Sequence, residues 1–170
     1  MDLAKLIRDI QDFPKPGIIF KDITTLLQDG DAFREAVNRM VKHYQDYDFD
    51  YIVGIEARGF IIGAPMAFLM GKGFIPVRKP GKLPGETISI TYDLEYGSNQ
   101  VEIHKDALKK DDKVIIIDDL LATGGTIIAA VKLIEELGGC VQGIGFLLEL
   151  GFLNGRDQLK GQDVFALLKE

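Results

Sequence analysis

Residues 114–126 read Val-Ile-Ile-Ile-Asp-Asp-Leu-Leu-Ala-Thr-Gly-Gly-Thr, and the rest of the chain can be interpreted outward from them. The first four residues are apolar and β-branched, which favours a strand buried on both faces of a parallel sheet. We expect this strand to stop at Asp118 and Asp119. Both carboxylates would then lie at the carboxyl edge of the sheet, where open α/β sheets bind their ligands.

The turn after the two acids is small, hydroxylated and rich in glycine, and it consists of Ala122, Thr123, Gly124, Gly125 and Thr126. Such a turn can point backbone N–H groups and hydroxyls at a phosphate, where a helix is expected to begin near Thr126. Carboxylates accept hydrogen bonds from vicinal hydroxyls, so this pattern suits a ribose phosphate. The alternative is an ordinary strand-to-helix turn with an acidic, glycine-containing loop.

The composition is typical of one soluble globular domain, with 170 residues, 46% of them hydrophobic and 27% charged. A net charge of −6 argues against nonspecific nucleic-acid binding, which needs clustered cations. We find no N-terminal hydrophobic signal and no apolar stretch long enough to span a bilayer, so we expect a cytoplasmic protein without membrane contact. The single cysteine, Cys140, lies in an apolar run and is expected to be a buried, inert thiol.

Apolar runs and helical patterns alternate along the chain, which predicts an α/β fold with a mainly parallel sheet flanked by helices. The expected strands are residues 51–55, 74–77, 114–117, one within 140–150 and 164–168, with a projecting hairpin whose arms lie near 88–92 and 101–103. The expected helices are an amphipathic one ending before Phe13, one from an Asp31 N-cap to about Tyr44, a deeply buried one to about Met70, and one over 126–137. Residues 18–24 are expected to form a structured loop or edge.

Three loops should meet at one edge of the sheet, because right-handed crossovers align the carboxyl ends of parallel strands. These loops are residues 56–60, 78–82 and 118–126, and their cations are Arg58, Arg78, Lys79 and Lys82. Each cation taken alone is most often a solvated surface charge. Beside a phosphate-binding turn, however, Arg58 and the amides around Ala57 and Gly59 could hold a pyrophosphate.

A pyrophosphate leaving group needs its charge neutralised, which implies Mg²⁺. No group of His, Cys and acidic residues has the spacing of a tightly held metal site, so we expect the ion to arrive with the substrate. His43 and His104 are isolated in the sequence and are interpreted as structural residues.

Residues 114–126 resemble the signature with which the type I phosphoribosyltransferase family holds 5-phosphoribosyl 1-pyrophosphate (PRPP). In that family the two acids hold the ribose 2- and 3-hydroxyls, and the turn holds the 5-phosphate. Four further stretches are similar, in the same order, to the adenine phosphoribosyltransferases of this family: residues 13–23, 56–60, 78–85 and 92–97. The resemblance implies a single phosphoribosyltransferase domain over residues 1–170, with a hood at about 1–30 and a flexible hairpin loop at about 80–104.

The activity that the resemblance implies is the reaction of adenine with PRPP to give AMP and pyrophosphate, with Mg²⁺. It also implies a homodimer in which Arg78 of one subunit reaches the site of the other. By position, the hood residues over the purine are Ile19, Phe20 and Lys21, and Leu150 closes the purine pocket. Phe20 offers a face for stacking and the backbone near Ile19 could read an amino group, although residues 18–20 could instead belong to the core.

The resemblance also assigns Glu95 as the general acid/base near the purine, with Tyr96 beside it; the alternative for Glu95 is a solvated carboxylate in a turn. Relatives that use hypoxanthine or guanine usually have Asp at the position of Ala122, which favours adenine here. Two alternatives stay open: a phosphoribosyltransferase for another acceptor such as xanthine or guanine, and a PRPP-binding regulator of transcription. The regulator would need a DNA-binding module and a basic face.

Overall fold

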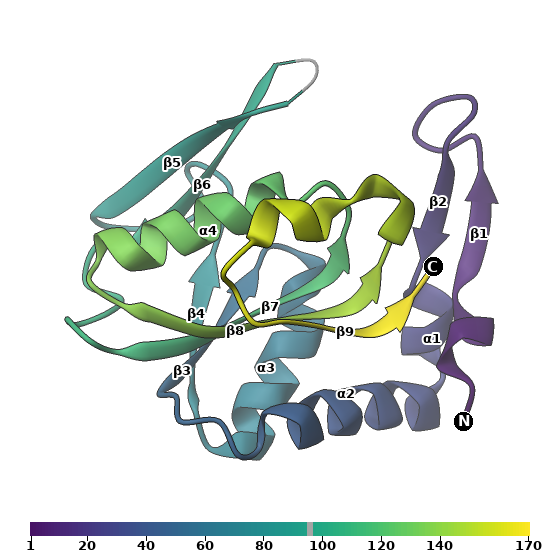
Figure 1. The fold of residues 1–170 in the computed structure, drawn as a ribbon, viewed down its shortest axis with the longest axis horizontal. Helices are drawn as coiled ribbons and strands as arrows, with labels where there is room; N and C mark the ends of the chain where they lie inside the picture. Colours follow the sequence, from purple (N-terminus) through teal and green to yellow (C-terminus); the bar gives the residue numbers. More distant parts are fainter. Residues whose placement is uncertain (95–96) are drawn as a thin grey trace.

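The protein is described here by a computed structural model that covers residues 1–94 and 97–170. At the centre of this part of the chain lies a five-stranded, wholly parallel sheet with the strand order β4-β3-β7-β8-β9 (Figure 1). Its strands are β3 (Tyr51–Ile55), β4 (Gly73–Val77), β7 (Lys113–Leu121), β8 (Cys140–Glu149) and β9 (Val164–Lys169). The predicted α/β fold with a parallel sheet is therefore confirmed.

Helices cover both faces of this sheet (Figure 1). The helices α2 (Gly30–Tyr44) and α3 (Arg58–Met70) pack on one face, and α4 (Gly125–Glu136) packs on the other. The short helix α1 (Thr24–Gln28), which the sequence pattern did not reveal, leads into α2. The molecule thus has three layers, with the sheet in the middle.

The strand β7 joins the two hydrophobic cores that these layers enclose. Val114 and Ile116 belong to the core on the α4 side, and Ile115 and Ile117 belong to the core beneath α2 and α3. All four side chains are fully buried. The prediction of a strand buried on both faces is confirmed, and its cause is the run of β-branched residues that can pack on either side.

Two antiparallel hairpins project from the same side of the molecule, upwards in Figure 1. One pairs β1 (Arg8–Gln11) with β2 (Ile19–Asp22), and the other pairs β5 (Thr87–Asp93) with β6 (Ser98–His104). The second confirms the hairpin predicted from alternating apolar residues. Single turns of 3-10 helix complete the fold at Leu3–Leu6, Gly151–Leu153 and Gly155–Leu159.

The start of the chain differs from the expectation. Only Leu3–Leu6 is helical, and Ile10, expected on the same helix, lies in β1 opposite Phe20 of β2. An isolated helix of this length gains little in water, whereas pairing with β2 gives every second backbone group a partner. The amphipathic helix was therefore wrong, and the loop or edge expected over residues 18–24 contains the strand β2.

Three further expectations are corrected. The N-cap of α2 is Asp29 rather than Asp31, because its carboxylate accepts hydrogen bonds from the amides of Asp31 and Ala32 at 3.1 and 3.0 Å. Helix α3 is not wholly buried: Phe68 is 85% exposed in the single chain. Cys140 is exposed rather than buried, because it opens β8 at the amino edge of the sheet.

Candidate active site

The two acids lie where β7 loses one of its neighbours. Pairing between β3 and β7 ends at Gly54 and Ile117, whereas pairing between β7 and β8 continues to Leu121 and Glu149. The strand therefore does not stop at the acids, as expected from the sequence, but carries them on an edge that β3 no longer covers. This edge leaves room for a ligand beside both carboxylates, at the carboxyl end of the sheet.

Asp118 and Asp119 form a tightly coupled pair. Oδ1 of Asp118 accepts a hydrogen bond of 2.8 Å from the Asp119 amide. Burial and the adjacent charge of Asp119 raise the pKa of Asp118 well above its ordinary value. Burial also raises the pKa of Asp119, and the guanidinium of Arg58 opposes this shift only in part. Burial therefore disfavours the ionised form of both carboxyls, and hydrogen-bond donors on a bound ligand would stabilise that form.

Arg58 joins these acids to the first hairpin. Its Nε lies 2.9 Å from Oδ2 of Asp119, and its guanidinium lies 5.3 Å from the centre of the Phe20 ring. The ion pair lacks hydrogen-bond geometry, so among the described residues Oδ2 of Asp119 is a buried acceptor without a hydrogen-bond donor. A buried acceptor of this kind suits a ligand hydroxyl.

Gly59 explains how α3 approaches the acids so closely. A Cβ at this position would lie 2.9 Å from Oδ1 of Asp118 and 2.9 Å from the carbonyl oxygen of Ile117. A residue with a side chain would have to push the start of α3 away from β7. Glycine therefore keeps the N-terminus of α3, with Ala57 and Arg58, against the carboxylates.

The turn after β7 opens the helix α4. Gly124, at the N-cap, has a φ of +92°, which glycine adopts without strain, and it has no side chain to cap the first turn. The N–H groups at the start of α4 are thus left for a ligand, and the helix dipole favours an anion there. Thr123 is exposed, and the Thr126 hydroxyl lies 2.8 Å from that of Tyr92 on β5.

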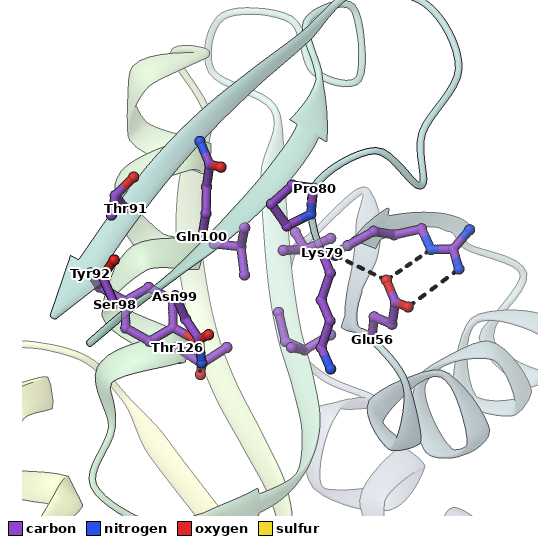
Figure 2. A pocket seen from close by; sticks show the side chains of 13 residues that line it. Glu56, Lys79, Pro80, Thr91, Tyr92, Ser98, Asn99, Gln100 and Thr126 are labelled. Atoms are coloured by element: carbon purple, nitrogen blue, oxygen red, sulfur yellow. Dashed lines mark hydrogen bonds and ion pairs between the residues drawn. The ribbon is translucent and has the colours of Figure 1, made fainter. Parts of the chain in front are cut away.

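A cavity of about 490 Å³ extends from this turn to the ends of β3 and β4. Figure 2 shows Tyr92, Asn99 and Thr126 on one side of it and Glu56 and Lys79 on the other. The predicted loops 56–60, 78–82 and 118–126 therefore come together as expected. Within this group Lys79 and Lys82 are exposed.

Glu56 organises the far side of this cavity, a role that sequence reasoning missed. Its carboxylate accepts hydrogen bonds from Nε of Arg78 at 3.0 Å and from the Lys79 amide at 2.9 Å (Figure 2). Burial alone would raise the pKa of Glu56, but these donors outweigh it and lower that pKa. In the single chain Arg78 is thus paired with Glu56. The feature of the sequence that could have indicated this role is the position of Glu56 directly after the apolar run that forms β3.

The first hairpin presents an apolar edge near the acids. Ile19 is 49% exposed, and Phe20 meets the ring of Phe13 edge-on at 5.2 Å. Ile19 is therefore not a core residue, and the alternative assignment of residues 18–20 to the core does not hold for it. Lys21 binds Asp9 at 2.7 Å and also Glu170, and both hydrogen bonds raise its pKa. This pairing ties the hairpin to the end of β9.

Leu150 and the segment after it support the turn from behind. Leu150 is buried, and its amide donates to the Leu121 carbonyl at 3.0 Å. A Cβ on Gly155 would lie only 2.1 Å from the Ala122 carbonyl oxygen. Arg156 then binds Glu149 at 2.9 Å and the Val164 carbonyl at 2.7 Å. No motif marked Gly155 or Arg156, because their partners are brought to them only by the fold.

Several predicted residues lie outside this arrangement. Glu95 and Tyr96 lie outside the described residues. His43 stacks on Phe165 with ring centres 3.7 Å apart, and the ring nitrogen Nε2 of His104 is 2.8 Å from the Pro84 carbonyl oxygen. Over residues 1–94 and 97–170, no three His, Cys, Asp or Glu side chains are grouped so that they could hold a metal ion, and no helix is long and apolar enough to cross a membrane.

The known proteins that this chain resembles in sequence and in structure are phosphoribosyltransferases. A family model described as a phosphoribosyl transferase domain matches residues 24–157. The adenine phosphoribosyltransferase of Halothermothrix orenii is 61% identical over 170 residues, which is 100% of both chains. The crystal structure of the Thermoanaerobacter pseudethanolicus adenine phosphoribosyltransferase is 54% identical and has a TM-score of 0.97 over 99% of this chain and 98% of that one. The Saccharomyces cerevisiae enzyme, complexed with adenine and an imino-altritol bisphosphate, is 39% identical and has a TM-score of 0.91, over 98% of this chain and 96% of its own.

Proposed function

This chain belongs to the phosphoribosyl transferase family, as one of its adenine phosphoribosyltransferases, and from that membership we propose that it transfers the 5-phosphoribosyl group of PRPP to adenine, releasing pyrophosphate and AMP. One observation supports this most strongly: the half-buried Asp118 and the buried Asp119 lie just before a glycine turn that opens α4. A ligand with vicinal hydroxyls and a phosphate matches both features at once.

Asp118 and Asp119 would hold the ribose hydroxyls. Ionised carboxylates accept strong hydrogen bonds from hydroxyls, and Oδ2 of Asp119, which is ion-paired with Arg58 but accepts no hydrogen bond from the described residues, gives one such acceptor. The turn would hold the 5-phosphate through the amides at the start of α4 and the hydroxyls of Thr123 and Thr126. Each of these charge-assisted hydrogen bonds stabilises the complex by about 1.5–3 kcal/mol.

Pyrophosphate would leave toward the cavity between the loops. The donors proposed for it are Ala57, Arg58, Gly59, Arg78, Lys79 and Lys82. Mg²⁺ prefers carboxylate and phosphate oxygens, so the acids of β7 suit an ion that arrives with PRPP and neutralises the leaving group. When the bond between C1 and the pyrophosphate oxygen breaks, positive charge develops on the sugar, and the nearby carboxylates stabilise it.

Adenine would lie between the first hairpin and the end of β8. The backbone of Ile19, a residue that is itself exposed, is suited to read the amino group of adenine, and the ring of Phe20 is suited to cover its face. Leu150 would close the other side. Lys21, held by Asp9 and Glu170, would fix the hairpin. Adenine N9 then bonds to C1, and Glu95 takes the proton that N9 releases.

The same family membership also suggests how the domain is organised and how it assembles. We propose one domain over residues 1–170, a hood at about 1–30 and a flexible loop at about 80–104 that excludes water from C1. We also propose a cytoplasmic homodimer in which Arg78 reaches the partner's site; the exposed apolar side chains of α3, such as Phe68, give such a dimer a surface to bury. Sedimentation as a fully active monomer would contradict the dimer.

The acceptor is tested by pyrophosphate release. With PRPP and Mg²⁺ we expect release with adenine and formation of AMP, and at most background release with hypoxanthine, guanine or xanthine. Release with an oxopurine would keep the PRPP site but contradict the proposed hood. PRPP binding without release for any base would favour the regulatory alternative.

A second prediction concerns Asp118→Asn. Because the pKa of Asp118 is raised on folding, the folded state binds more protons than the unfolded state above the ordinary carboxyl range, and stability is lost as pH rises through this window. Asparagine carries no charge to bury and keeps an oxygen for the Asp119 amide. We expect Tm at pH 8 to rise by about 2–6 °C, with the gain disappearing at low pH. The PRPP affinity should fall roughly tenfold or more.

Thermal unfolding between pH 4 and pH 8 measures this trade-off. Asp48→Asn is the matched control, because Asp48 is exposed and the hydrogen bond from Lys113 lowers its pKa. That variant should gain no stability at pH 8. A destabilised Asp118→Asn protein at pH 8 would contradict the proposed cost of the buried charge.

A further inference from the structure

Tyr92 connects the second hairpin to the turn that opens α4. Its hydroxyl lies 2.8 Å from Oγ1 of Thr126, and the pair is partly buried. Its ring lies against Gly125, where a Cβ would be 3.3 Å from ring atom Cδ2. Figure 2 shows Tyr92 and Thr126 next to each other at the edge of the cavity. The hairpin therefore touches the turn through one hydroxyl and one aromatic ring.

The direction of this hydrogen bond depends on what occupies the turn. In the free protein either hydroxyl can be the donor. An ionised phosphate oxygen only accepts, so a phosphate in the turn would take the single proton of the Thr126 hydroxyl. Thr126 must then accept from Tyr92. The result is a chain from Tyr92 through Thr126 to the phosphate, and consecutive hydrogen bonds of this kind strengthen one another.

The position of Tyr92 makes this chain relevant to the hairpin as a whole. Tyr92 pairs with Asn99 across the two strands, close to the hairpin tip. Tyr92, Asn99 and Thr126 together line both the 490 Å³ cavity and a second cavity of about 560 Å³, which Thr123 and Gly125 of the turn also line. Any interaction that restrains Tyr92 would therefore restrain a residue that lines both cavities.

We propose that Tyr92 is a positioning residue that couples occupation of the 5-phosphate turn to the stability of the β5–β6 hairpin. The inference rests on the proposed function, because it takes the occupant of the turn to be the 5-phosphate of the substrate. Phosphate binding would thus stabilise the strand that leads, three residues later, to Glu95. The substrate's phosphate end would in this way prepare the loop before the chemical step.

Hydrogen exchange tests the coupling without turnover. The probe is ribose 5-phosphate, which has the phosphate and the hydroxyls but no leaving group. At saturating probe we expect exchange of the β5 and β6 amides in the unmodified protein to slow by about 2- to 10-fold. In Tyr92→Phe, which keeps the ring on Gly125, the probe should still bind, but this slowing should be lost. The KM for PRPP should rise by about the same factor, with kcat changed less.

Ser89→Ala is the matched control, because the Ser89 hydroxyl accepts a 2.8 Å hydrogen bond from Gln100 on the exposed face of the same hairpin. This variant should keep the slowing caused by the probe. Equal slowing in Tyr92→Phe and in the unmodified protein would overturn the coupling while leaving the proposed function intact. If the unmodified protein does not bind ribose 5-phosphate at all, the assignment of the turn to a 5-phosphate fails, and the coupling fails with it.

Discussion

Replacing Gly155 with alanine is expected to weaken PRPP binding by roughly 100-fold or more, although Gly155 itself touches no substrate group in the proposed mechanism. The added Cβ would lie 2.1 Å from the Ala122 carbonyl oxygen and 3.0 Å from its carbonyl carbon. Contacts this short cannot exist, so backbone must move. Ala122 opens the proposed phosphate turn, and a displacement of about 1 Å there would spoil several hydrogen bonds together.

The segment that carries Gly155 cannot easily move instead. Arg156 is held by Glu149 at 2.9 Å and by the Val164 carbonyl at 2.7 Å, which ties it to the end of β8 and to the start of β9. The Arg156 pair also lowers the pKa of Glu149, so this carboxylate stays ionised at neutral pH. The turn is consequently the part that yields, which is why we expect a larger effect on PRPP binding than on folding.

PRPP binding by calorimetry and Cm in urea together measure this effect. Gly30→Ala is the control, because a Cβ at Gly30 meets nothing within 4 Å. It should leave both PRPP affinity and Cm close to those of the unmodified protein. PRPP affinity within threefold of normal in a folded Gly155→Ala protein would contradict the proposed support of the turn.

Replacing Glu95 with leucine should lower kcat by about 10²–10⁴-fold, the usual contribution of a positioned general acid/base, and leave PRPP binding largely intact. Glu95→Gln keeps the shape and removes the charge, so it should lose nearly as much. The assignment comes from family membership, and Glu95 lies between β5 and β6, the strands whose Tyr92 contacts the turn.

Steady-state kinetics with adenine and equilibrium binding of PRPP separate the two effects. Glu86→Gln is the matched control at the base of the same hairpin, where Glu86 is exposed and lies 3.5 Å from Lys105. It should retain normal turnover. Equal losses of turnover and PRPP affinity in Glu95→Leu would contradict a role in proton transfer.

The central strands could be predicted because each is a local pattern. The apolar runs at residues 51–55 and 114–117 are too continuous for a half-exposed strand, and both are buried in the sheet. The carboxylates near the end of β7 and the glycines after it also lie close together in the sequence, so the ligand chemistry that they share could be predicted before the fold was known. The first hairpin was misread because the pairing of Ile10 with Phe20 joins residues whose local pattern suited a helix.

The sequence by itself determined the class of fold, the acidic and glycine-rich turn, and through resemblance the family and the adenine acceptor, because each of these is written in neighbouring residues. Only the tertiary structure decided which distant groups meet around the site: Gly155 behind Ala122, Tyr92 on Thr126, and Glu56 holding Arg78. The reason is physical. These contacts depend on strand register and on close approach of backbones 22 to 34 residues apart in the chain, and no local pattern specifies either.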